Sequence, residues 1–200
     1  SMGAGGRKAR IAGIGSYAPE KVLTNQDLEK MVDTNDEWIT KRTGIKERRI
    51  AAEDTATSDL AYQAAKNALV DADLAAEDLD LILVATSTQD YIGFPATACV
   101  LQDKLGITDT PAFDLSAACT GFIYGISVAT QYIETGAYDN ILVVGSEVLS
   151  KILDWDDRNT CVLFGDGAGA AVLTPGQQSG ILSNVLGADG SRSDVLKIPE

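Results

Sequence analysis

The amino-acid sequence predicts an α/β fold in which helices cover a mixed, mostly parallel sheet. Two runs, 79–86 (LDLILVAT) and 140–145 (NILVVG), are apolar without alternation, which is typical of strands buried on both faces. Segments with helical periodicity lie before and between these runs, and strands that alternate with helices are joined by right-handed crossovers. The 200 residues, 45% of them hydrophobic, suit one soluble globular domain with a sizeable core.

The first elements of the domain follow a short leader. Residues 1–9 are interpreted as an expression tag and a disordered N-terminus, because the chain opens with SMG, and 10–200 as the domain. A short strand is expected over 10–15 (RIAGIG). Thr24 is expected to start a helix, TNQDLEKMV, in which Asp27 takes the capping-box position.

Two further helices are expected before the first buried strand, and another lies directly beyond it. A short helix is expected around 36–38, and Ser58 is expected to cap a longer one. Beyond the buried strand, we expect a helix beginning at Pro95 and a strand over 112–115.

The most apolar helix is expected from Cys119 to Thr135, closed by Gly136. Its residues leave almost no polar face, so it is expected to be buried all round. A single sheet would hardly cover it on both sides, so we expect further protein against its far side. The last third, 161–194, is predicted to form strands with glycine-rich turns and no helix.

The charge balance limits the possible partners. With 16 basic and 29 acidic residues the net charge is -13, so the surface as a whole repels nucleic acid and anionic lipid, and neither is expected as a partner. A local basic run over 41–49 (KRTGIKERR) is where an anionic ligand is expected to bind. There is no apolar stretch of the roughly 20 residues that span a membrane and no signal-peptide core, so we expect a cytoplasmic protein.

The chain has three cysteines and no histidine. Ser-His-Asp and Cys-His catalysis and histidine-ligated metal sites are therefore excluded within this chain, and no metal is expected. The spacing of the cysteines forms neither a zinc pattern nor a disulfide framework, so free thiols are expected. Cys99, expected inside a helix, and Cys161, expected inside a strand, are interpreted as structural.

Two glycine patterns invite a dinucleotide-binding interpretation. Gly13, Gly15 and Ala18 fit G-x-G-x-x-A after a strand, and a second glycine run occupies 165–169. The fingerprint requires a helix to begin within the motif, but Pro19 interrupts the first pattern and the second is followed by a strand-like segment. We interpret these glycines as sites of close backbone approach in turns.

Cys119 is the candidate nucleophile. It follows the strand over 112–115, after the small residues SAA, and opens the apolar helix. The unpaired N–H groups and positive end of a helix favour a thiolate, and a strand-to-helix turn projects the side chain above the sheet, where α/β folds bind ligands. A buried structural cysteine is the alternative interpretation.

Trp38 beside the basic run of 41–49 is the second candidate site. An aromatic plane and guanidinium groups together can sandwich an adenine ring and hold phosphates. Ordinary packing of this tryptophan is the alternative interpretation.

Five motifs resemble β-ketoacyl-acyl carrier protein synthase III, the thiolase-fold enzyme that initiates type II fatty acid synthesis. They are VDTNDEWITKRTGIKERRI (32–50), GFPATACVLQDKLGI (93–107), AFDLSAACTGFIYG (112–125), LVVGSEVLS (142–150) and DDRNTCVLFGDGAGAAVL (156–173). The resemblance runs from about residue 10 to the end of the chain. It implies one half of a thiolase-like fold, whose buried central helix starts at the nucleophile and packs against its counterpart from a C-terminal half missing here.

The resemblance also implies roles for individual residues. Cys119 in AACTGF matches the acylated nucleophile. Trp38 and Arg158 match the pair that stacks on the adenine of coenzyme A, while Thr34 and Arg42 match residues that contact the adenine and the phosphates.

Two phenylalanines match positions of the acyl site in the family. Phe94 matches the residue that lines the partner's acyl pocket across the interface of a homodimer, and Phe164 matches an active-site phenylalanine. The chain departs from the family because it lacks the histidine and asparagine of the second half, which promote decarboxylation of malonyl-acyl carrier protein and stabilise the enolate.

The implied activity is decarboxylative condensation of an acyl-CoA starter, expected to be acetyl-CoA, with malonyl-acyl carrier protein. Coenzyme A thioester is a substrate in this reaction, and no tightly bound cofactor is expected. The chain by itself is expected to be inactive in the condensation. Two alternatives stay open: a related condensing enzyme for polyketide or quinolone starters or a thiolase-like relative, and a noncatalytic half completed by a separate partner subunit.

Overall fold

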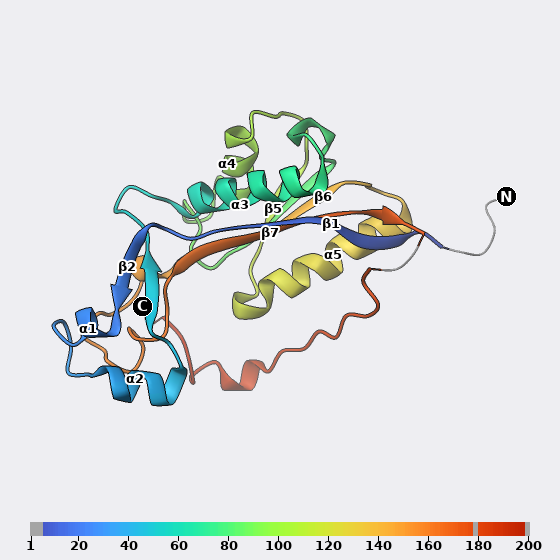
Figure 1. Cartoon of the computed structure of the whole chain (residues 1–200). Helices are drawn as coiled ribbons and strands as arrows, with labels where there is room; N and C mark the ends of the chain where they lie inside the picture. The colour runs from blue at the N-terminus through green and yellow to red at the C-terminus, as the bar shows by residue number, and fades with distance from the viewer. Residues whose placement is uncertain (1–5, 178–179, 199–200) are drawn as a thin grey trace.

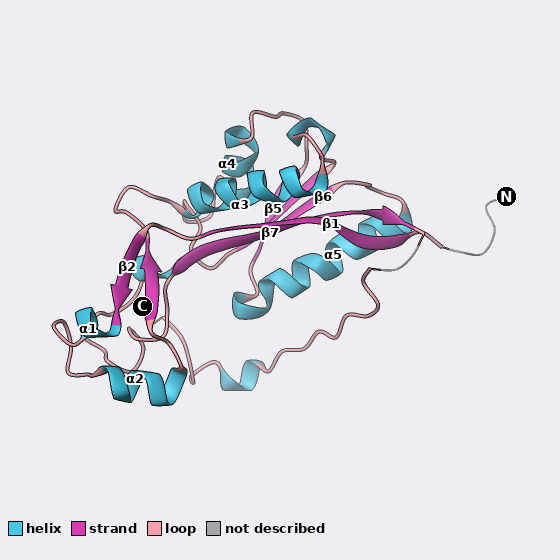
Figure 2. Ribbon diagram, in the orientation of Figure 1, coloured by secondary structure: helices cyan, strands magenta, loops and turns pink. Residues whose placement is uncertain are grey.

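The computed structural model describes residues 6–177 and 180–198, which form a large and a small sheet with helices on both faces of the large one (Figures 1 and 2). The large sheet has the strand order β1-β7-β6-β4-β5. Its strands are β1 (Lys8–Tyr17), β4 (Leu81–Ala85), β5 (Ala112–Leu115), β6 (Ile141–Val148) and β7 (Asp166–Gly176). The predicted α/β class is confirmed.

Strand direction divides this sheet into two parts. β5, β4 and β6 run parallel, whereas β7 pairs antiparallel with both β6 and β1. Since β1 and β6 both oppose β7, β1 runs in the same direction as β6, β4 and β5, and the predicted mixed, mostly parallel sheet is confirmed, with β7 alone reversed among the described strands. The reason lies between β6 and β7, where residues 149–165 contain loops and a 3-10 turn (Leu149–Lys151) instead of the crossover helix that a parallel return needs.

The first strand begins earlier than predicted. β1 starts at Lys8, and Ala9 is only 1% exposed, so these two residues belong to the fold and not to a disordered leader. The first five residues of the predicted tag lie outside the described residues.

β4 lies at the centre of the core, and none of its five residues is more than 6% exposed. Ile82 and Val84 pack toward α3 (Thr57–Ala72) and α4 (Thr97–Lys104), whereas Leu81 and Leu83 pack toward α5 (Gly121–Thr135) on the opposite face. A strand covered on both faces has no polar side, which is why its sequence shows no alternation.

Helix α3 crosses β1 at backbone contact distance. A Cβ on Gly15 would lie 2.3 Å from both the Ala64 carbonyl oxygen and the Ala68 nitrogen, and Gly13 is equally crowded by the last turn of the helix. Both glycines permit close backbone approach, as predicted. They lie inside a strand, however, and not in turns.

The ends of two helices differ from the prediction because distant carboxylates cap them. α3 begins at Thr57, and Ser58, inside its first turn, donates its N–H and hydroxyl to the Asp90 carboxylate (2.9 and 2.5 Å). α4 begins at Thr97 and not at Pro95, since the Thr97 N–H donates to the Asp114 carboxylate of β5 at 2.8 Å. Such partners are invisible to the local sequence.

A small unit adjoins one end of the large sheet (Figure 1). It consists of the antiparallel strands β2 (Lys21–Thr24) and β3 (Glu47–Ile50) with the helices α1 (Asn25–Leu28) and α2 (Asp36–Thr43). Thr24 and Asp27 form the predicted capping box through bonds of 3.1 and 3.2 Å. The α1 helix is shorter than predicted, because the N–H groups of Lys30 and Met31 already bond three residues back.

Helix α5 is buried on one side only. Its residues Gly125, Ile126, Ala129 and Ile133 pack against the sheet, whereas Ile123 is 50% exposed. Within the described chain the sheet covers one side of α5, which agrees with the expectation that further protein is needed against its far side.

The segment 180–198 runs beside α5 in an extended course (Figure 1), and the Tyr124 hydroxyl donates to the Gly187 carbonyl at 2.8 Å. It contains a 3-10 turn (Gly190–Arg192) and no strand among its described residues, so β7 is the only strand that the predicted last third forms there. Cys161 lies in a series of turns and not in a strand. A further 3-10 turn (Ala76–Asp78) links α3 to β4.

Candidate functional site

Cys119 lies in the turn that joins β5 to α5. A 3-10 turn (Ala118–Thr120) precedes the helix, so the cysteine stands two residues before the first residue of α5 and not at its start as predicted. Ala118 adopts a φ of 45°, a left-handed conformation that costs a non-glycine residue about 1–2 kcal/mol. The Cys119 side chain is exposed, which contradicts the alternative of a buried structural cysteine.

The turn is held against the sheet by close contact with the central strand. A Cβ on Gly121 would lie 3.0 Å from the Ala85 Cβ, so the first residue of α5 packs directly on the end of β4. The Thr120 hydroxyl donates to the Ala117 carbonyl at 2.8 Å and closes the turn. Backbone geometry and core packing together fix where the Cys119 sulfur points.

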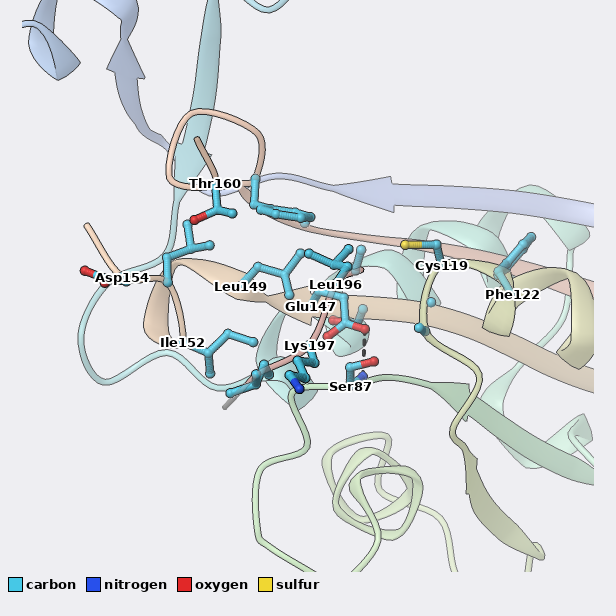
Figure 3. Close-up of a pocket in the computed structure, with 18 of the residues that line it drawn as sticks. Ser87, Cys119, Phe122, Glu147, Leu149, Ile152, Asp154, Thr160, Leu196 and Lys197 are labelled. Atoms are coloured by element: carbon cyan, nitrogen blue, oxygen red, sulfur yellow. Dashed lines mark hydrogen bonds between the residues drawn. The ribbon is translucent and has the colours of Figure 1, made fainter. Parts of the chain in front are cut away.

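The sulfur faces a cavity of about 750 Å³ at the carboxyl ends of β4 and β6 (Figure 3). This is the edge of the sheet at which α/β folds bind ligands. Apolar side chains make up much of the lining: Phe122, Leu149, Ile152, Leu153, Phe164, Leu196 and Ile198. The cavity can accept an acyl chain next to a nucleophile.

Glu147, at the end of β6, stands in this cavity near the nucleophile (Figure 3). Its carboxylate accepts hydrogen bonds from the Ser87 N–H (2.7 Å) and from the hydroxyls of Thr86 (3.2 Å) and Thr88. These bonds hold the loop that follows β4. The occupied oxygens of Glu147 suit a role in fixing the cavity wall.

The lining of the cavity also includes charged groups. Asp154 and Asp157 contribute carboxylates, and Lys197, which donates to Asp194 at 2.6 Å, is the lining cation among the described residues. Hydrogen bonds from the Thr160 hydroxyl and the Asn159 N–H lower the pKa of Asp157, so this carboxylate is ionised at neutral pH.

The small unit brings three of the predicted ligand residues together. The guanidinium carbons of Arg42 and Arg158 each lie 4.4 Å from the centre of the Trp38 ring. Arg42 is on the same helix, one turn on, whereas Arg158 comes from the loop before β7 and also pairs with Asp33 at 3.4 Å. At 4.4 Å each guanidinium group is within the range of a cation–π contact with the indole, and such surfaces are of the kind on which planar rings also stack.

Thr34 precedes the helix that carries Trp38. Its hydroxyl oxygen is buried and has no hydrogen-bond partner among the described residues. An unsatisfied buried hydroxyl is uncommon. Because this oxygen is enclosed, the contact with the adenine and phosphates that the resemblance implies needs a movement that exposes it.

The two predicted phenylalanines lie in different surroundings. Phe164 lines the cavity that contains Cys119. Phe94 does not: it is 87% exposed, beside Ile92 (97% exposed) and Tyr91 (55% exposed), in the loop before α4. The structure therefore leaves Phe94 apart from the site within the same chain.

The remaining cysteines differ from each other. Cys161 is fully buried, and burial raises the pKa of its thiol. Cys99 is exposed on α4, which does not fit its interpretation as a structural cysteine. All three thiols are free.

Sequence reasoning missed several cavity residues. Leu149 and Ile152 follow β6, and Leu196 and Ile198 come from the extended C-terminal segment. Glu147 had a usable signal, because a carboxylate that ends an unbroken apolar strand needs a polar partner. The other four are apolar loop residues, which no local pattern separates from ordinary packing.

The described residues contain no cluster of acidic and cysteine side chains that could hold a metal ion. In the same part of the chain, no helix has the length and apolar character needed to cross a bilayer.

The sequence and the fold of this chain are similar to those of known proteins. Residues 113–190 match the family model described as 3-oxoacyl-[acyl-carrier-protein (ACP)] synthase III. A curated relative named beta-ketoacyl-[acyl-carrier-protein] synthase III, from Caldanaerobacter subterraneus subsp. tengcongensis, is 62% identical over 192 residues, which cover 96% of this chain and 58% of that protein. The chain thus spans little more than half the length of this relative.

Solved structures agree with the sequence match. The 3-oxoacyl-(acyl carrier protein) synthase III from Pseudomonas aeruginosa PAO1 superposes with a TM-score of 0.91 at 46% identity, covering 97% of this chain and 61% of that one. The priming beta-ketosynthase from the R1128 polyketide biosynthetic pathway superposes with a TM-score of 0.83 at 36% identity, covering 87% of this chain and 52% of that one. The predicted thiolase-like architecture is confirmed.

Proposed function

Because this chain carries the sequence and fold of β-ketoacyl-acyl carrier protein synthase III over most of its length, we propose that it is the nucleophile-bearing part of a condensing acyltransferase. The observation that carries the proposal is the placement of the Cys119 sulfur at the wall of an apolar cavity of about 750 Å³. A thiol so placed can accept an acyl group whose chain lies in the cavity.

The first step is transfer of an acyl group from coenzyme A to Cys119. The thiolate attacks the thioester carbonyl, a new carbon–sulfur bond forms, and coenzyme A leaves as a thiolate that takes up a proton. Helix α5 begins two residues after Cys119, so the N–H groups of its first turn point toward the end of the helix at which the thioester oxygen gains negative charge. Acetyl-CoA is the proposed starter.

The second step is condensation with malonyl-acyl carrier protein. Loss of CO2 from the malonyl group leaves a carbanion that attacks the acyl-enzyme, which releases the Cys119 thiolate and 3-oxoacyl-acyl carrier protein. This chain has no histidine, so any imidazole that assists the step comes from outside these 200 residues. We therefore expect the chain by itself to be inactive in condensation.

We propose that the adenine of coenzyme A stacks on Trp38, with Arg158, Arg42 and Thr34 holding its ring and phosphates. Both guanidinium groups lie 4.4 Å from the ring centre, and the adenine is proposed to take the place of one of them. At about 3.5 Å per stacked layer, the opened gap between indole and guanidinium is about 7 Å. Movement of Arg158 is the simplest way to open it, because this residue comes from a loop.

We also propose that the chain forms a homodimer through the loop that carries Phe94. A phenylalanine 87% exposed beside an isoleucine 97% exposed is typical of an interaction surface. In the dimer Phe94 would contribute to the partner's acyl site. Sedimentation of Phe94→Ser, with exposed Val70→Ser as control, tests this: a dimer that persists at micromolar concentration contradicts it.

The free thiols and net negative charge support a cytoplasmic location, away from nucleic acid and membrane surfaces.

The test of the function is acyl labelling. We expect acetyl-CoA to add an acetyl group to the peptide that contains Cys119, seen by mass spectrometry, and to leave Cys99 unmodified although that thiol is also exposed. If neither the chain nor the product of the whole gene labels at Cys119, the mechanism is wrong.

A second candidate is a condensing enzyme for polyketide or quinolone starters, which the similarity to the R1128 priming ketosynthase favours. A panel of acyl-CoAs of increasing length and branching separates the two candidates, since a preference for acetyl-CoA supports fatty acid initiation. A noncatalytic partner subunit would label with none of them.

A further inference from the structure

A fully buried amide lies at the centre of the small unit. Asn25 is 0% exposed, and its side-chain nitrogen donates to the Asp36 carboxylate and the Ile45 carbonyl, both at 2.8 Å. The Asp36 carboxylate stands at the first residue of α2, and this bond lowers the pKa of Asp36. Asn25 therefore ties both ends of the helix that carries Trp38 and Arg42.

A buried guanidinium continues this network to the other side of the adenine site. Arg48 is 6% exposed, and it donates to the Asn25 side-chain oxygen (2.9 Å) and to the Val162 carbonyl (2.9 Å). Val162 belongs to the loop that runs from Arg158 to Gly165, and a Cβ on Gly165 would lie 2.9 Å from the Arg48 Cβ. Arg48 thus links Asn25, which is bonded at both ends of α2, with the loop that follows Arg158.

Arg48 has an unusual environment for a buried cation. No carboxylate lies within salt-bridge distance of it in the part of the chain that the structure describes, and its Nε has no hydrogen-bond partner there. Burial lowers the pKa of the guanidinium. Burying a charge without an ion pair lowers the stability of the fold, so we infer that Arg48 has a role that a neutral side chain would not fill.

We propose that Arg48 and Asn25 are positioning residues that set the distance between the helix bearing Trp38 and the loop bearing Arg158, and thereby the affinity for the adenine end of coenzyme A. The inference rests on the proposed function, because it assigns the network to the same ligand. This helix and this loop are otherwise joined by side-chain stacking on Trp38 and by the small apolar cluster of Leu28, Ile39, Cys161 and Val162. The planar guanidinium group of Arg48 donates in two directions, to Asn25 and to the Val162 carbonyl, and the ammonium group of a lysine lacks this fixed geometry.

The experiment uses Trp38 as the reporter. The chain has two tryptophans, so Trp155→Phe leaves Trp38 as the only one. In this background, Arg48→Lys and Asn25→Ala are compared with Arg10→Lys, which makes the same exchange at an exposed arginine of β1, outside the basic run 41–49. Acrylamide quenching reports the exposure of Trp38, titration with coenzyme A reports affinity, and the rate of iodoacetamide alkylation at Cys119 reports the integrity of the distant site.

We expect Arg48→Lys and Asn25→Ala to increase quenching of Trp38 and to weaken binding of coenzyme A about tenfold, the fold-change that corresponds to the loss of one net hydrogen bond. Alkylation of Cys119 should stay at the rate of the parent, and Arg10→Lys should change none of the three measurements. In a Trp38→Ala background, Arg48→Lys should add no further loss of affinity.

Two results would overturn the inference. One is unchanged quenching of Trp38 in folded Arg48→Lys, which keeps the charge and remains informative even if Asn25→Ala fails to fold. The other is a change in Cys119 alkylation that parallels the change in quenching, since the network would then support the whole fold. If the parent does not bind coenzyme A at all, the proposed function fails in that respect, while the quenching of Trp38 still decides the positioning role.

Discussion

Cys119 and Trp38 lie in regions of the molecule that are held in place by different forces. Cys119 follows a strand of the large sheet, and its turn rests on the fully apolar strand β4 and on the close contact of Gly121 with Ala85. Trp38 lies in the small unit, where the buried polar groups of Asn25 and Arg48 join the supporting segments. A packed apolar core holds Cys119 in place, whereas a few directional hydrogen bonds hold the segments around Trp38.

This contrast predicts different sensitivities. Apolar packing is shared by many side chains, so a single polar substitution elsewhere changes it little. In a hydrogen-bond network, the loss of one member leaves its partners without a bond. Substitutions in the small unit should therefore alter ligand binding and leave the chemistry of Cys119 intact. Substitutions in the core should affect both sites.

The largest effect is expected from the nucleophile itself. Cys119→Ala, in the product of the whole gene, should lower the rate of condensation by at least about 10³-fold, because it removes the atom that carries the acyl group. Release of CoA in the presence of malonyl-acyl carrier protein measures it. Cys99→Ala is the control, and condensation that survives Cys119→Ala would contradict the mechanism.

Next in size is a core substitution that should affect both sites. Gly15→Ala should destabilise the chain by about 1–3 kcal/mol or more, because its Cβ would lie 2.3 Å from the backbone of α3. Urea unfolding measures the loss. Gly169→Ala in β7, where a Cβ meets no atom within 4 Å, should leave stability nearly unchanged, and equal effects of the two would refute the proposed crowding.

Substitution of Trp38 should change ligand binding without changing the reactivity of Cys119. Trp38→Ala should weaken coenzyme A binding about tenfold, as expected for loss of stacking on one base, while the alkylation rate of Cys119 stays constant. Isothermal titration and peptide mass spectrometry measure the two quantities. A parallel loss of both would show that the regions are not independent.

The smallest effect concerns Asp36. The hydrogen bond from Asn25 lowers its pKa in the folded state, so its contribution to stability is present above the unfolded pKa of about 3.9 and is lost as pH falls through the lower folded value. Asp36→Asn should therefore be less stable than the parent at pH 6, and the difference should shrink below pH about 4. Urea unfolding at both pH values, with exposed Glu37→Gln as control, checks this; a difference that grows in acid would contradict it.

Sequence patterns predicted the structure best where neighbouring residues in the chain decide it. The unbroken apolar run at Leu81–Ala85 is a strand covered on both faces, and the capping box of Thr24 and Asp27 formed as expected. They failed where distant groups decide: Ser58 lies inside a helix because Asp90 takes its polar groups, and α4 begins at Thr97 because Asp114 caps it.

The sequence by itself determined the α/β class, the turn that presents Cys119 and the association of Trp38 with basic residues, because period, burial and capping depend on neighbours within a few positions. Only the tertiary structure decided the antiparallel return of β7, the stacking of Arg158 on Trp38 and the bridge from Arg48 to Val162. Each of these joins segments separated by long stretches of chain, and such pairings depend on how whole surfaces pack, which no short window of sequence contains.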